Sequence, residues 1–99
     1  MPYTVEFAQS VEGHFRVLTT RDRTLGFDAI QRQLLHEPLK ETRNRKPLRP
    51  NPIAPWELRV GHLRVFFEVA GAESGVVRIL AVGRKRRNTL VIGGKEVQL

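Results

Sequence analysis

The sequence contains no cysteine, which excludes disulfide bonds and thiolate zinc sites. No apolar run approaches the roughly 20 residues of a membrane span, and the start, "MPYTVEFAQ", lacks the regions of a signal peptide. His14, His36 and His62 are widely separated and lack metal-ligand spacing. A glycine-rich phosphate loop and a Ser-His-Asp pattern are also missing. We therefore expect a cytoplasmic protein without metal, cofactor or membrane contact.

Acidic residues are scarce in the second part of the chain. Residues 1–39 hold four Arg against five acidic residues, whereas residues 40–99 hold thirteen Lys or Arg against five acidic residues. The whole net charge of +7 therefore comes from residues 40–99. Such asymmetry indicates a polyanionic partner, most often nucleic acid, with an acidic protein as the alternative. A well-solvated basic surface without a partner is the simplest alternative.

Two helices are predicted between about Ser10 and His36, as a helical hairpin or a bent helix. Ser10 is the expected cap of the first helix, and Thr20 or Asp22 that of the second. Pro38 is expected to stop the second helix. The apolar residues at helical spacing are Val11, Phe15 and Leu18, then Leu25 or Phe27, Ile30 and Leu34. We expect both stripes to pack in the core.

Strands are predicted on both sides of these helices. Residues 3–8 alternate as a first strand, and residues 56–60 and 63–69 form a hairpin. A turn at "AGAESG" leads to a strand over 76–82, which "GRKRRN" ends, and residues 89–99 give a final short strand or hairpin. Residues 40–55, with four prolines and five basic residues, predict an irregular loop. The order predicts one α+β domain over residues 1–99, with an antiparallel sheet of three to four strands covered by helices on one face.

The hairpin brings like charges together. Gly61-His62 suits a type II′ turn, which places Arg59 directly opposite Arg64. Like charges in that position are destabilising. Trp56, Leu58, Val60, Leu63, Val65, Phe67 and Val69 then share the face toward the helices, and Glu57, Arg59, Arg64, Phe66 and Glu68 share the open face.

More basic residues are expected at one end of this open face. Pairing Val69 with Val77 sets Glu68 opposite Arg78 and Arg64 opposite Val82, and it brings Arg84 and Arg86 to the open face. A bulge at Gly83 would bring Lys85 and Arg87 there instead. The loop adds Arg45, Lys46 or Arg49. Arginine forks match phosphate oxygens, and Phe66 is a candidate to stack on an unpaired base.

The pattern "WELRVGHLRVFFEV" followed by "VVRILAVGRKRRN" resembles the RelE/ParE superfamily of bacterial toxins, from about Tyr3 to Val91. The resemblance implies a toxin that a cognate antitoxin neutralises by covering its basic groove. RelE-like members cleave messenger RNA in the ribosomal A site, whereas ParE-like members inhibit DNA gyrase. We favour the RelE-like activity, an endoribonuclease that inhibits translation. The alternatives are a ParE-like gyrase inhibitor and a non-catalytic basic module that binds nucleic acid or antitoxin.

The resemblance also implies residue roles. Arg64 stands where RelE-type toxins place the arginine that contacts the scissile phosphate, and Lys85 stands at a second catalytic basic position. Lys46 and Arg49 fall in the loop that supplies catalytic lysines. Val91 replaces the tyrosine that RelE has eight positions after the glycine. Proton transfer therefore falls to a lysine among other cations, Lys46 or Lys85, or to His62.

Overall fold

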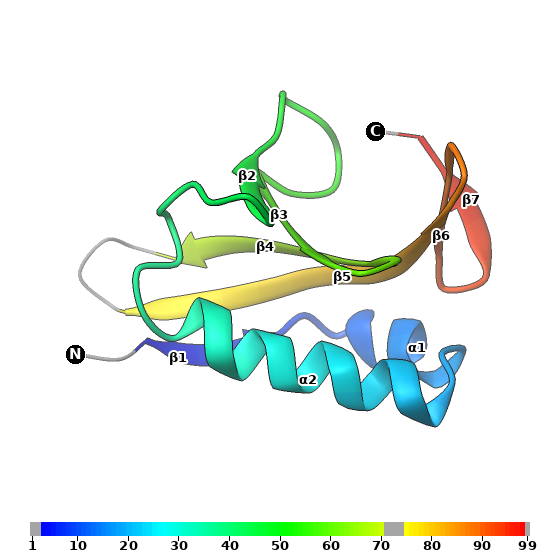
Figure 1. The fold of residues 1–99 in the computed structure, drawn as a ribbon, viewed down its shortest axis with the longest axis horizontal. Helices are drawn as coiled ribbons and strands as arrows, with labels where there is room; N and C mark the ends of the chain where they lie inside the picture. Colours follow the sequence, from blue (N-terminus) through cyan, green and yellow to red (C-terminus); the bar gives the residue numbers. More distant parts are fainter. Residues whose placement is uncertain (1–2, 71–74, 99) are drawn as a thin grey trace.

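The computed structural model describes residues 3–70 and 75–98. Its elements are β1 (Thr4–Phe7), α1 (Val11–Arg16), α2 (Thr20–Leu34), β2 (Arg45–Pro47), β3 (Trp56–Val60), β4 (Leu63–Ala70), β5 (Val76–Arg86), β6 (Thr89–Ile92) and β7 (Lys95–Val97). One sheet runs β2-β3-β4-β5-β6-β7 with antiparallel pairing, and β1 pairs with β5 in parallel. Both helices lie on one side of this sheet (Figure 1). The predicted α+β fold is confirmed, but the sheet has seven strands over the described residues where three to four were predicted, because β1, β2 and β7 also join it. The predicted turn at 70–75 includes residues 71–74, which lie outside the described residues.

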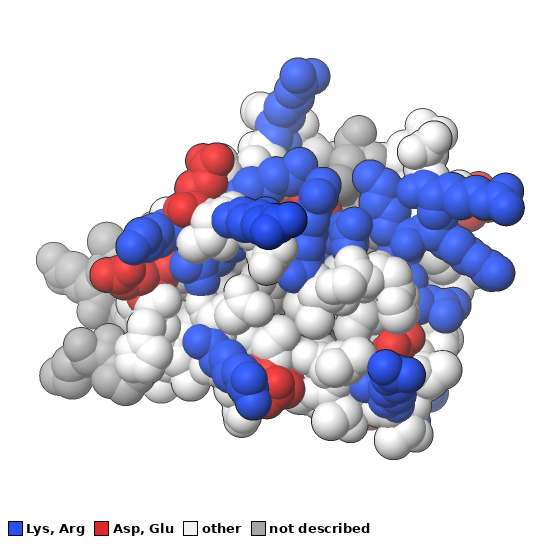
Figure 2. Space-filling view, viewed as in Figure 1, with Lys and Arg blue, Asp and Glu red and all other residues white. Residues whose placement is uncertain are grey.

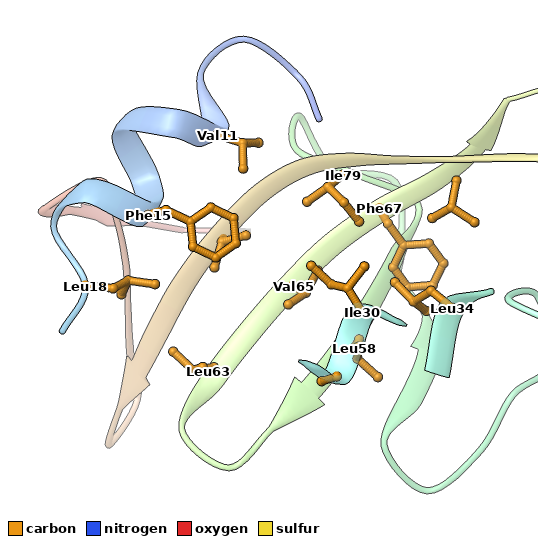
Figure 3. Packing of buried hydrophobic residues seen from close by; sticks show 13 residues of the cluster. Val11, Phe15, Leu18, Ile30, Leu34, Leu58, Leu63, Val65, Phe67 and Ile79 are labelled. Carbon is orange, nitrogen blue, oxygen red and sulfur yellow. The ribbon is translucent and has the colours of Figure 1, made fainter. Parts of the chain in front are cut away.

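The main hydrophobic core lies between the sheet and the helices (Figure 3). The hairpin contributes Leu58, Val65 and Phe67, which pack in one cluster with Ile30 and Leu34 of α2. All five side chains are almost fully buried. Burying a side chain of this size contributes about 1.5–3 kcal/mol. The predicted apolar face of the hairpin is confirmed, and this packing holds the other face of the same strands in place.

The helix caps differ from those predicted. Ser10 is the N-cap residue of α1, but its side chain makes no capping hydrogen bond. Thr19 caps α2, rather than Thr20 or Asp22, because its Oγ1 accepts a hydrogen bond from the Asp22 backbone N–H at 3.1 Å. Asp22 is thus the third helical residue, where a carboxylate is also favoured by the helix dipole.

The buried stripe of α2 also differs in its first turns. Leu25 and Phe27 are 39% and 44% exposed, while Gly26 between them is buried. A Cβ at Gly26 would lie 3.4 Å from the Phe15 ring, which is ordinary contact distance. Phe27 instead stacks on the Phe15 ring from outside, with ring centroids 4.4 Å apart.

A second, smaller core lies on the opposite face of the sheet. It contains Ala54, Phe66, Ala81, Leu90 and Ile92. Residues 40–55, which we call the proline-rich segment, cover part of this face. The segment is less irregular than predicted, since it contains the short edge strand β2. Within this segment, the Asn51 side chain accepts hydrogen bonds from the backbone N–H groups of Ile53 and Ala54. The face predicted to be open is therefore partly covered.

The register between β4 and β5 shifts by one residue. Arg59 pairs with Arg64, and Glu68 pairs with Arg78, both as predicted. A bulge then intervenes between Phe66 and Phe67, so that Arg64 lies opposite Gly83 and not opposite Val82. The predicted end of the strand at Val82 is also wrong, because β5 continues to Arg86.

The bulge decides which basic residues of β5 share a face with Arg64. Since side chains alternate along a strand, the pairing of Arg64 with Gly83 puts Lys85 on that face. Arg84 pairs with the core residue Leu63, so Arg84 and Arg86 belong to the face that carries the helices. The sequence suggested a bulge at Gly83, but the observed bulge lies opposite Phe66 and Phe67. Lys85 reaches the face of Arg64, as the suggested bulge also required.

Candidate functional site

Three basic side chains from three neighbouring strands surround one buried carboxylate. Glu57 of β3 has a side chain that is only 8% exposed. Its carboxylate oxygens lie 4.0 Å from Lys46 Nζ, 3.7 Å from Arg59 Nε and 3.7 Å from Arg64 Nε. We call these four residues the Glu57 cluster. The carboxylate supplies the opposite charge that the facing arginines of the hairpin need.

Arg64 is the most buried cation of the Glu57 cluster, with 11% of its side chain exposed. Its Nη1 donates hydrogen bonds to the carbonyls of Gly61 and Leu63 at 2.7 and 2.8 Å. Burial lowers the pKa of Arg64, Glu57 raises it, and Arg59 lowers it further. The group remains charged in spite of these effects. Its Nε is buried, lies 3.7 Å from the Glu57 carboxylate and makes no hydrogen bond among the described residues, so the charge of Glu57 and the two carbonyls hold the guanidinium in place.

Lys85 joins this face at the neighbouring end of β5. Together with Glu57 it lines a hollow of about 360 Å³, whose other lining residues are Asn88, Leu90, Val97 and Gln98. β5 extends beyond the end of the hairpin, and Lys85 therefore lies next to the Glu57 cluster. The structure therefore puts all three predicted catalytic residues, Lys46, Arg64 and Lys85, on one face of the sheet.

Arg45 does not reach the Glu57 cluster. Its Nε donates to the Lys40 carbonyl at 2.8 Å, and its Nη1 donates to the Gln33 carbonyl near the end of α2. Arg45 is 6% exposed, and burial lowers its pKa while Glu37 raises it. The prediction that Arg45 contacts phosphate is wrong for this arrangement, because the guanidinium already binds the carbonyls that α2 and the following turn leave free.

Phe66 is unavailable for stacking on a base. Its side chain is fully buried in the second core, with Ala81 and Leu90 in the same cluster. The alternation of residues along β4 correctly predicts the face on which Phe66 lies. It does not predict that the proline-rich segment and β6 cover that face.

The other predicted contacts divide between the two faces. Arg49 is exposed and shares a hollow of about 430 Å³ with Lys46. Arg87 has a positive φ of 58° in the turn after β5. His62 lies toward α2, because its Nε2 is 3.0 Å from the buried Asp22 carboxylate. Arg84 and Arg86 lie on the helix-bearing face, which corrects their expected place beside Arg64.

Val91 and the only tyrosine also lie away from the Glu57 cluster. Val91 pairs with Arg84, while its neighbours Leu90 and Ile92 belong to the second core. Tyr3 packs against the main core. Over residues 3–70 and 75–98, the structure shows no group of three or more acidic, histidine or cysteine side chains that could hold a metal ion, and in these ranges no helix is long and apolar enough to cross a membrane.

Sequence reasoning missed the central role of Glu57. The signal was present, because two arginines that face each other across a hairpin require a counter-charge within reach. Glu57 is two residues before Arg59 and so lies on the same face of β3. Figure 2 shows the wider charge distribution: basic side chains gather over the strands and around the β5–β6 end, whereas basic side chains over α2 lie beside acidic ones.

The chain was compared with known proteins. No protein-family model matches it, and no curated protein matches it significantly. The crystal structure of the toxin-antitoxin complex RelBE2 from Mycobacterium tuberculosis matches with a TM-score of 0.73 and 28% identity, over 86% of this chain and 93% of the other. The chain has the fold of this RelE-type toxin, which supports the resemblance to the RelE/ParE superfamily. A RelE-RelB complex from the archaeon Pyrococcus horikoshii OT3 shares the RelE/ParE fold, with a TM-score of 0.68 and 20% identity over 88% of this chain and 99% of the other.

The RelE/ParE fold explains why the site lies where it does. The helices cover one face of the sheet and leave the other to the Glu57 cluster. The basic residues come from β2, the hairpin and β5, which follow one another along the sequence and are neighbours in the sheet.

Proposed function

We propose that this protein is the toxin of a toxin-antitoxin pair and that it cleaves messenger RNA on the ribosome. The observation that carries the proposal is the convergence of Lys46, Arg59 and Arg64 around Glu57, with Lys85 beside them. Guanidinium groups bind phosphate through paired hydrogen bonds, and Arg59, with 42% of its side chain exposed, presents such a group at the surface of the cluster. We also propose that the protein acts in the cytoplasm, because ribosomes translate there.

The reaction proposed for this site requires no water molecule and no cofactor. The 2′-OH of one nucleotide attacks the neighbouring phosphorus, the bond to the 5′ oxygen breaks, and a cyclic phosphate and a 5′-OH result. A base takes the proton of the 2′-OH, and an acid gives a proton to the 5′ oxygen. Fixed cations stabilise the extra negative charge on the phosphate oxygens in the transition state.

The exposure of each side chain suggests its role. Arg64 is held by the hairpin carbonyls and so acts as the fixed stabilising cation. Arg59, 42% exposed, supports it from the facing strand. We assign proton transfer to Lys46 and Lys85. Lys46 is 47% exposed and able to reach substrate, whereas Glu57 is buried among three cations and acts to position them.

The test is cleavage of a defined message by translating ribosomes, mapped by primer extension. Arg64→Ala is expected to reduce cleavage by about 10²–10³-fold, as the loss of one oxyanion-stabilising donor does, and Arg64→Lys to restore part of the activity. Arg78→Ala is the matched control, since it removes an arginine that pairs with Glu68 on the same sheet. Full cleavage by a folded Arg64→Ala variant would refute the proposed site.

A ParE-like action on DNA gyrase is the second candidate, and one observation favours it. Tyr3 and His14 lie on the helix side, and His62 is paired with Asp22, so these common proton-transfer groups are not at the Glu57 cluster. A gyrase inhibitor needs no such group. If the wild-type protein leaves messages intact but causes gyrase-dependent DNA breaks, this second function replaces the first.

We also propose that an antitoxin protein is the cognate partner. Two matched structures are complexes of a RelE-type toxin with its antitoxin. The basic residues of the Glu57 cluster and its surroundings offer complementary charge to an acidic segment. Co-expression with an acidic protein encoded next to this chain is expected to give a stable complex and to suppress toxicity.

A further inference from the structure

A second basic hollow lies at the tip of the hairpin, away from the Glu57 cluster. It has a volume of about 360 Å³ and is lined by His62, Arg84, Lys85, Arg86 and Val91. Arg84 and Arg86 are exposed, and neither forms an ion pair within the described parts of the chain. The hollow therefore holds two arginines whose charge is not neutralised.

Arg84 and Arg86 belong to the face of the sheet opposite the Glu57 cluster, and Lys85 lines the hollows on both sides. Arg84 pairs with Leu63, which belongs to the main core beneath the helices, whereas Lys85 pairs with Leu90 of the second core. Arg84 and Arg86 are alternate residues of β5, so their side chains emerge side by side, roughly 7 Å apart along the strand. That separation suits neighbouring phosphates of an extended nucleic-acid strand.

Two acidic groups lie beside this hollow, and Asp22 is one of them. Asp22 is 5% exposed, and its carboxylate lies 3.0 Å from His62 Nε2. This carboxylate thus already has a partner in the imidazole, and it lies in the first turn of α2, where a carboxylate is stabilised. Glu96 is exposed on the same face of the sheet, because it pairs with Val91 as Val91 pairs with Arg84, but it forms no ion pair with Arg84 or Arg86 in the described parts of the chain.

We propose that this hollow binds the phosphate backbone of a nucleic-acid segment other than the one at the Glu57 cluster. The inference rests on the proposed function only for the nature of the partner. Two arginine forks recognise phosphate without regard to sequence. The protein thereby holds a nucleic acid at two places, one on each face of β5, which aligns the strand at the first site without adding to the chemistry.

The lining favours nucleic acid over an acidic protein segment. Stable protein interfaces have an apolar centre, and here the single apolar lining residue, Val91, is half-buried. The large exposed apolar side chains lie elsewhere, and two of them, Phe7 and Phe27, line a groove of about 690 Å³ beside α1. That groove, and not the basic hollow, has the composition of a protein contact.

The experiment compares the salt dependence of RNA binding among full-length variants. Arg84→Ala/Arg86→Ala removes the two forks from the hollow. Arg16→Ala/Arg21→Ala is the matched control, because it removes the same charge from exposed helical positions. A labelled 30-nucleotide single-stranded RNA is titrated at several salt concentrations by fluorescence anisotropy. Each lost phosphate contact lowers the slope of log K against log salt by about 0.7.

The Arg84/Arg86 pair is expected to lower this slope by about 1.4, and the control pair to leave it unchanged. NMR signals of the His62 ring should shift on RNA binding, also in an Arg64→Ala background. An unchanged slope, or shifts with poly-glutamate but not with RNA, overturns the proposal. If the wild-type protein cleaves messages but the Arg84/Arg86 variant shows an unchanged salt slope, only the second site is refuted. RNA bound through both arginines without any cleavage would refute only the proposed function.

Discussion

Replacing Glu57 by glutamine tests whether the Glu57 cluster is an electrostatic unit. The variant keeps the shape of the side chain and removes its charge. Three cations then remain together, and Arg64 among them is only 11% exposed. Removing one partner of a buried ion pair costs about 3–5 kcal/mol, since it leaves the other charge uncompensated.

The expected loss is smaller, because two of the cations reach solvent. Lys46 and Arg59 are 47% and 42% exposed, and exposed pairs contribute at most about 1 kcal/mol each. Arg64 dominates the effect, so we expect Glu57→Gln to lower the free energy of unfolding by about 2–3 kcal/mol. In a domain of this size that corresponds to a fall in Tm of roughly 10–20 °C.

The assay is urea and thermal unfolding followed by circular dichroism, with Glu68→Gln as the matched control. Glu68 is on the same sheet, but its side chain is 35% exposed and its partner Arg78 is 42% exposed. Its replacement should cost less than about 1 kcal/mol. A double variant, Glu57→Gln with Arg64→Met, should recover part of the loss, because both buried charges are gone. Equal effects of Glu57→Gln and Glu68→Gln would refute the reasoning.

Three further predictions concern the surroundings of the site. Arg45→Met should lower the free energy of unfolding by about 2–4 kcal/mol in urea titrations, because the Lys40 and Gln33 carbonyls lose a charged donor; a loss within 0.5 kcal/mol would contradict this. Gly83→Ala should cost about 1–3 kcal/mol, since its Cβ collides with the Val91 carbonyl, and unchanged thermal unfolding would argue against so close a β6. Burial lowers the pKa of His14 below 6.5, and its Nδ1 accepts the Val82 N–H, so the unfolded state binds more protons just below pH 6.5. Stability should therefore fall as the pH decreases below about 6.5, by at most about 1.4 kcal/mol per pH unit, and less in His14→Gln; identical pH profiles would refute this.

The sequence predicts the hairpin well because local and global signals agree there. Gly61 has a φ of +60°, as the first position of a type II′ turn requires, and the pairing of Arg59 with Arg64 follows. The apolar alternation of Leu58, Val65 and Phe67 then determines which face meets the helices. Turn chemistry and core packing point to the same register.

The sequence does not predict events that depend on distant segments. The bulge beside Phe66 has no local signature, yet it determines which basic residues of β5 share a face with Arg64. Burial of Phe66 depends on the proline-rich segment folding over the sheet. Arg45 could not be recognised as structural, because its acceptor at Gln33 is twelve residues away in a preceding helix.

Because of the bulge in β5, the site depends on which face of the sheet each basic side chain of the strand lies on, as well as on how many basic residues there are. Residues 84–87 are all basic, so a one-residue insertion or deletion before them leaves the net charge and the run itself unchanged. It would nevertheless turn the strand over, bringing arginines to the Glu57 cluster and sending Lys85 to the opposite face. Such a change would put guanidinium groups in the place of a lysine. A lysine can give up and take back a proton, whereas a guanidinium group cannot. A change of length at this bulge could therefore leave a protein of this fold able to bind phosphate but without a lysine for proton transfer at the Glu57 cluster.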